Sequence, residues 1–114
     1  MSYPSKTEFL EMFGIEPVEE DPRMAYCRYV KCSVDGAKQI DVSFSEVSQS
    51  FQVVFLFGNE ELVRVSSESV RAIRLERDNI GARIDVEFGM RDLMSRAIVI
   101  LEPHLHCHWW TLRA

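Results

Sequence analysis

The feature that most constrains this chain is an alternation of apolar and polar residues with a period of two, which begins at Tyr26. Every second residue is apolar in the segments 40–44 and 82–88. This spacing places the apolar side chains on one face of a β-strand. Asp35-Gly36 separates two such segments, and this dipeptide is typical of a two-residue hairpin turn. The pattern therefore predicts antiparallel strands joined by tight turns.

Residues 51–57 depart from simple alternation, because Val54 and Leu56 are apolar at positions where the neighbouring strands are polar. A strand that is apolar on both faces is typical of the interior of a sheet. Gly58-Asn59 then gives a second turn signal. Extended segments and turns recur as far as Leu112, and together they predict an antiparallel β-meander of about seven to eight strands.

A short helix is predicted before the strands. Ser5 and Glu8 have the spacing of a capping box, in which each side chain satisfies a free backbone amide of the other residue. Gly14 stands where a left-handed residue would end the helix, and Pro17 follows. The predicted fold class is α+β, with this helix packed on the sheet. We expect one domain, in which residues 1–22 form an acidic helix and connector and residues 23–114 form the sheet.

All of the net charge lies in the amino-terminal segment. The 114 residues carry a formal charge of −5, and residues 1–22 contain Lys6 and the acids Glu8, Glu11, Glu16, Glu19, Glu20 and Asp21. Such a segment disfavours nucleic-acid binding and favours a basic protein partner, so these six acids are candidate partner-binding residues. The alternative is a solvated helix face and connector.

The composition also bears on the compartment. The longest apolar run, residues 97–101, is far shorter than a membrane span, and the amino terminus lacks the apolar segment of a signal peptide. Cys27, Cys32 and Cys107 are an odd number of cysteines. A cytoplasmic protein without a membrane partner is therefore expected.

Three histidines give the sequence its most suggestive group of side chains. His104, His106 and His108 are two residues apart and would share one face of an extended strand. Neighbouring imidazoles of this kind can bind zinc or copper. The alternative is that they are half-exposed sheet residues beside Trp110, and three histidines on one straight strand rarely all reach one ion. A metal site here is the second functional hypothesis, and the preferred prediction is that the chain holds no cofactor.

No catalytic motif stands out, so no catalytic residue is predicted. Arginine occurs ten times and lysine three times in the chain. Arginine and aromatic residues are enriched at protein interfaces, which makes Trp110 a further candidate partner-binding residue, with Trp109, Tyr26 and Tyr29 as other possible anchors.

Several strand-like segments carry a resemblance to a known class of proteins, and they are Phe51–Phe55, Glu61–Val65, Ile84–Phe88, Ile100–Pro103 and Trp110–Arg113. With these segments, residues 51–114 resemble small β-rich bacterial domains among the immunity proteins of polymorphic-toxin and contact-dependent inhibition systems. The resemblance implies a non-enzymatic cytoplasmic protein that neutralises one cognate toxin by stoichiometric binding. A third hypothesis is a structural subunit that forms a homodimer through an exposed sheet edge.

Overall fold

The computed structural model describes residues 3–79, 81–90 and 93–113. Within them the chain forms one α-helix, one 3-10 helix and nine strands. A five-stranded sheet consists of β1 (Glu19–Asp21), β2 (Tyr26–Cys32), β3 (Lys38–Ser45), β4 (Ser50–Phe57) and β5 (Glu60–Ser67). A four-stranded sheet consists of β6 (Val70–Arg77), β7 (Ala82–Met90), β8 (Leu93–Glu102) and β9 (His106–Arg113). The strands of each sheet follow one another in chain order, and every pair is antiparallel.

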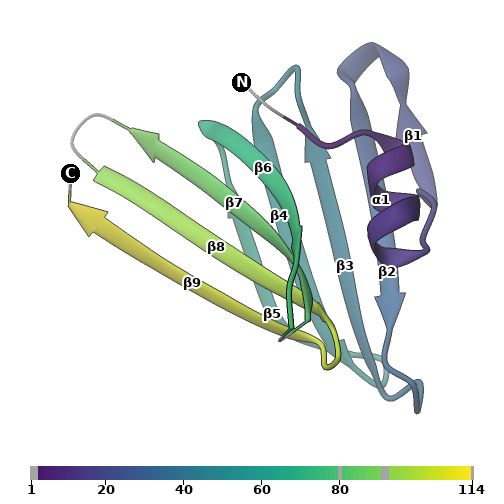
Figure 1. Ribbon diagram of the computed structural model, residues 1–114. Helices are drawn as coiled ribbons and strands as arrows, with labels where there is room; N and C mark the ends of the chain where they lie inside the picture. The colour runs from purple at the N-terminus through teal and green to yellow at the C-terminus, as the bar shows by residue number, and fades with distance from the viewer. Residues whose placement is uncertain (1–2, 80, 91–92, 114) are drawn as a thin grey trace.

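The two sheets lie face to face, and the core fills the space between them (Figure 1). The predicted alternation supplies the apolar side chains of both inner faces. From the five-stranded sheet the core contains Ile40, Val42, Phe44, Phe51 and Val53, and from the four-stranded sheet it contains Ile84, Val86, Ala97 and Val99. The alternate positions point to the two outer faces and are mostly polar, although Val54, Ile98 and Ile100 are apolar there.

Helix α1 (Lys6–Phe13) completes the core beside the edge strand β6. It begins with the predicted capping box: the Glu8 amide donates to Ser5 Oγ at 3.2 Å, and the Ser5 amide donates to Glu8 Oε1 at 3.1 Å. It ends at Gly14, whose φ of 69° lies in the left-handed region that glycine adopts readily. Phe9 and Phe13 are buried, so the helix packs on the sheet through its aromatic side.

The structure confirms the α+β class, the antiparallel meander and the amino-terminal helix, and it refines the strand count. The meander is divided between two sheets, and one strand was not foreseen. β1 lies in the connector, where its three residues pair with β2. β7 extends as far as Met90 and β8 begins at Leu93, with these two residues opposite each other. The interior position predicted for residues 51–57 is confirmed, because β4 lies between β3 and β5.

Candidate partner-binding surface

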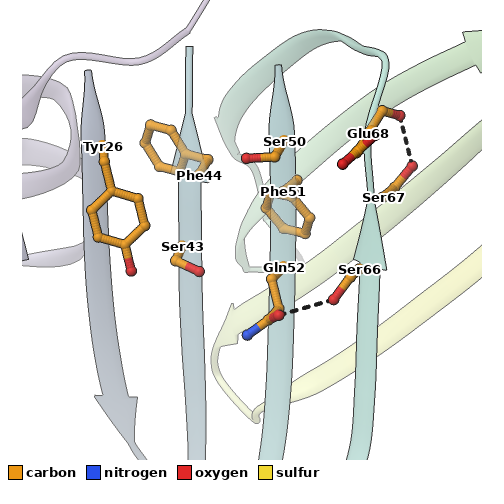
Figure 2. A pocket seen from close by; sticks show the side chains of 9 residues that line it. All are labelled: Tyr26, Ser43, Phe44, Ser50, Phe51, Gln52, Ser66, Ser67 and Glu68. Atoms are coloured by element: carbon orange, nitrogen blue, oxygen red, sulfur yellow. Dashed lines mark hydrogen bonds between the residues drawn. The ribbon is translucent and has the colours of Figure 1, made fainter. Parts of the chain in front are cut away.

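The outer face of the five-stranded sheet contains a hollow of about 430 Å³ near one end of strands β2 to β5. Small polar side chains form its centre. Ser43, Gln52 and Ser66 lie at paired positions on three adjacent strands, so they form one row across the sheet. Tyr26, Ser50 and Glu68 also line the hollow, as Figure 2 shows. We refer to this site as the serine hollow.

Hydrogen-bonding groups dominate the serine hollow. Ser66 Oγ donates to Gln52 Oε1 at 2.9 Å, and Ser67 Oγ donates to the backbone carbonyl of Glu68 at 2.9 Å (Figure 2). Phe44 and Phe51 belong to the buried core and lie beneath the polar row. The arrangement presents hydroxyl and amide groups over a rigid apolar base, which suits recognition of a polar group.

An arginine held by two carboxylates adjoins the serine hollow. Arg28 lies opposite Ser43 on the neighbouring strand. Its Nε donates to both carboxylate oxygens of Asp41 at 3.0 Å, and its Nη2 donates to Oδ2 at 2.7 Å. Glu19 of β1 lies 3.5 Å from Nη1. Hydrogen bonding and charge attraction from Asp41 raise the pKa of Arg28 above its ordinary value. The guanidinium is therefore fixed in place, and its charge is balanced by acids on both sides.

The six acids of the amino-terminal segment are all exposed, but they do not form one surface. Glu8 takes part in the capping box, and Asp21 accepts from the Arg23 amide at the start of the 3-10 helix Pro22–Met24. Glu20 pairs with Lys6 at 2.9 Å, which raises the pKa of that lysine. The alternative of a solvated, structural role thus accounts for a large part of this charge.

Glu11 and Glu16 differ from the other acids. Within the part of the chain that the structure describes, neither makes a hydrogen bond or an ion pair. Glu16 acts on Lys6 only through longer-range charge attraction. These two carboxylates are therefore the members of the acidic segment whose charge is most available to a partner.

The outer face of the four-stranded sheet carries a network of ion pairs. Arg83 contacts Glu76 and Asp78, both at 2.8 Å, and Arg74 contacts Glu87 at 3.3 Å. Asp85 lies at a polar position of its strand, but only 1% of it is exposed. The side chain of Arg96 covers it, with Nε donating to Asp85 Oδ1 at 2.9 Å. Sequence periodicity missed this burial because the position lies on the polar face of its strand.

The aromatic anchors separate into different environments. Tyr26 lines the serine hollow, whereas Tyr29 is only 2% exposed and belongs to the core, so its predicted role at an interface is wrong. Trp110 lies in β9 opposite Arg96, on the strand at the edge of the sheet. The side chains of Trp109 and Trp110 lie outside the described part of the structure.

The three histidines do not share one strand. His104 precedes β9, so its predicted place on an extended strand with the other two is wrong. His106 and His108 lie opposite Ile100 and Ile98 of β8, and their rings form an edge contact with centroids 4.3 Å apart. Across residues 3–79, 81–90 and 93–113, no three histidine, cysteine or acidic side chains are grouped closely enough to hold a metal ion.

The three cysteines are free thiols. Cys32 is exposed, and Cys27 and Cys107 are partly buried. Burial raises the pKa of the Cys107 thiol, and burial together with Glu20 raises that of Cys27. Both thiols are protonated at neutral pH and are poor nucleophiles.

The serine hollow was missed by the sequence analysis. Its signal was present, because serine occupies polar positions of several strands, but only the strand register brings Ser43 and Ser66 into one row with Gln52. No α-helix in the described ranges is long and apolar enough to cross a membrane.

Comparisons with known proteins bear on the fold. No protein-family model matches the sequence, and no curated protein matches it. Among solved structures, one chain of a "Contact-dependent growth inhibition toxin - immunity protein complex from Klebsiella pneumoniae 342" is similar, with a TM-score of 0.89. The match covers 97% of this chain and 96% of that chain at 22% identity. The chain therefore has the fold of a component of that complex, which confirms at the level of the fold the resemblance to proteins of contact-dependent inhibition systems.

Proposed function

We propose that this chain is a bacterial immunity protein that neutralises a cognate toxin of a contact-dependent growth inhibition system by stoichiometric binding in the cytoplasm. The observation that carries the proposal is the shared fold. It extends over 97% of this chain and was found in a chain of a toxin–immunity protein complex. The resemblance of residues 51–114 to immunity proteins, based on the sequence alone, supports the same assignment.

The chemistry of the surface supports the immunity role over the toxin role. Four arginines of the four-stranded sheet, Arg74, Arg77, Arg83 and Arg96, are each paired with a carboxylate. Burial keeps the Cys107 thiol protonated. These groups stabilise the fold, and a protein built in this way acts through the shape and charge of its surface.

The charge supports a basic toxin as the partner. The net charge of −5 originates in the amino-terminal segment, where Glu11 and Glu16 have no ion-pair partner in the described structure. An acidic surface attracts a basic protein over a distance and accelerates its capture. A toxin that acts on nucleic acid carries such a basic surface, because it must bind phosphates. We therefore expect the cognate toxin to be a nuclease.

Co-expression tests the proposal. The gene next to that of this chain is expressed as the candidate toxin domain in a susceptible bacterium, with or without this chain, and growth is recorded. We expect this chain to restore growth and an unrelated immunity protein to give no protection. Growth arrest caused by this chain alone would assign it the opposite role, and failure to protect against the neighbouring toxin would contradict the proposal.

A further inference from the structure

We propose that the serine hollow receives an arginine side chain of the toxin, an inference that rests on the proposed function and specifies its interface. The first support is the shape of the site. Ser43, Ser50 and Ser66 are short side chains on three adjacent strands, whereas Tyr26 and Gln52 beside them are larger. The surface is therefore low over the serines, with Gln52 between Ser43 and Ser66 and Tyr26 on the β2 side, and the hollow leaves about 430 Å³ for an inserted group.

The second support is the chemistry of the lining. Nine described residues line the hollow; none is basic, and Glu68 is acidic. Their hydroxyl and amide oxygens can accept hydrogen bonds from an inserted donor. Gln52 Oε1 already accepts from Ser66, which fixes the amide in the row without removing its remaining lone pair. The site thus offers several acceptors from different directions and one negative charge.

The third support is the charge around the rim. Glu19 and Asp21 of β1, with Asp41 of β3, lie on the same face as the hollow. Two basic side chains lie on this face: Arg28, which contacts Glu19 and Asp41, and Arg64 of β5, which is paired with Glu61. The face therefore remains negative beside the hollow, and a cationic group of a partner is favoured there over an anionic one.

A guanidinium fits these three features better than an ammonium does. It is planar and carries five N–H donors, so it can satisfy several acceptors on neighbouring strands at once. Its weaker hydration also makes the loss of surrounding water less costly. Arginine is enriched among the residues that dominate protein interfaces, and its insertion into a pocket is typical of such sites.

A small-molecule probe tests the preference of the hollow without any toxin. N-acetyl-arginine amide is titrated into the 15N-labelled protein, and N-acetyl-citrulline amide serves as its uncharged match. We expect saturable shifts of the backbone amides of Ser43, Gln52 and Ser66 with the arginine probe. Citrulline should give shifts about tenfold smaller at the same concentration, because it lacks the charge. Equal responses to both probes, or shifts confined to another surface, would overturn the inference.

Two substitutions locate the site. Glu68→Gln removes the charge and Ser66→Tyr fills the hollow, and both positions are exposed, so the fold should be retained. Each should abolish saturation by the arginine probe. Glu60→Gln removes an acid at the opposite end of β5, and Val34→Tyr adds the same ring at the exposed turn between β2 and β3; neither should change the response. Saturable binding of the arginine probe to a folded Ser66→Tyr variant would show that the probe does not bind in the serine hollow.

Binding of the toxin domain separates this inference from the proposed function. If the unmodified chain binds the toxin, Ser66→Tyr should weaken binding about tenfold, mainly through faster dissociation. Toxin binding that is unaffected by Ser66→Tyr would overturn the inference and leave the immunity role intact. Failure of the unmodified chain to bind the toxin would contradict the immunity role, whatever the arginine probe shows.

Discussion

The ring of Phe9 in α1 lies flat against the ring of Tyr29 in β2, with the centroids 3.8 Å apart and the planes inclined by 9°. Phe44 of β3 joins this group, with its ring centroid 5.9 Å from that of Phe9. Phe9 and Tyr29 are both almost completely buried. The helix is therefore joined to the five-stranded sheet mainly through a stack of aromatic rings.

Replacing Phe9 should have a large effect on stability. Phe9→Ala removes a fully buried ring from this stack, and we expect the free energy of unfolding to fall by about 3–5 kcal/mol. Leu10→Ala is the control, because Leu10 follows directly on the same helix and is 47% exposed. Urea denaturation followed by circular dichroism measures both. Similar losses for the two variants would show that the aromatic stack does not anchor the helix.

The buried carboxylate of Asp85 should contribute more than the exposed acids around it. Asp85→Asn leaves Arg96 without its charged partner, and we expect a loss of about 2 kcal/mol, since Arg96 itself is half-exposed. Glu87→Gln on the same strand should cost less than about 1 kcal/mol, because its pair with Arg74 is exposed. Equal losses in urea denaturation would contradict the distinction between the two pairs.

Stability should fall at alkaline pH. Burial, with a smaller contribution from Glu46, raises the pKa of Tyr3 from 10.0 to about 12. Burial also raises the pKa of Tyr29, Cys27 and Cys107. These groups ionise more easily in the unfolded chain than in the folded protein. Their contribution to the free energy of unfolding is therefore complete below their ordinary pKa values, and it is lost as the pH rises through their pKa values in the folded protein.

The urea midpoint measured from pH 8 to pH 12 checks this dependence. We expect a steady fall that begins near pH 9, where the unfolded thiols ionise, and steepens above pH 10, where the unfolded phenols ionise. Tyr3→Phe should make the upper part of the curve shallower. A midpoint that is constant across this range would contradict the assignment of these groups as buried and protonated.

The sequence predicted the elements of the fold better than their assembly. The period of two placed Ile84 and Val86 on an inner face, and the spacing of Ser5 and Glu8 located the helix start. The division into two sheets could not be predicted from the alternation, because the residues between β5 and β6 do not distinguish a connection to a second sheet from a hairpin turn within one sheet. β1 was missed because all three of its residues are polar, which gives no alternation.

The candidate site was less predictable, because it depends on contacts between distant strands. The acidic segment was identified, but only the structure shows that Glu20 pairs with Lys6 while Glu11 makes no ion pair in the described residues. The serine hollow required the register of four strands. Asp85 lies at a polar position of its strand, and its burial depends on the Arg96 side chain from the next strand.

The free acids should govern the rate of toxin capture. Glu11→Gln together with Glu16→Gln should slow association with the toxin domain severalfold at low salt and leave the dissociation rate unchanged. At high salt the variant and the unmodified chain should associate at the same rate, because screening removes the long-range attraction. Surface plasmon resonance at two salt concentrations measures both rates. A faster dissociation of the variant would instead place these acids in direct contact with the toxin.

The central claim is that this protein works by forming a stoichiometric complex with a toxin, and isothermal titration calorimetry measures this most directly. The purified toxin domain encoded beside the gene is titrated with this chain. We predict a single transition at one copy of each protein, with loss of toxin activity at the same ratio. Full inhibition at a small fraction of that ratio, or no heat of binding with an active toxin, would contradict the account.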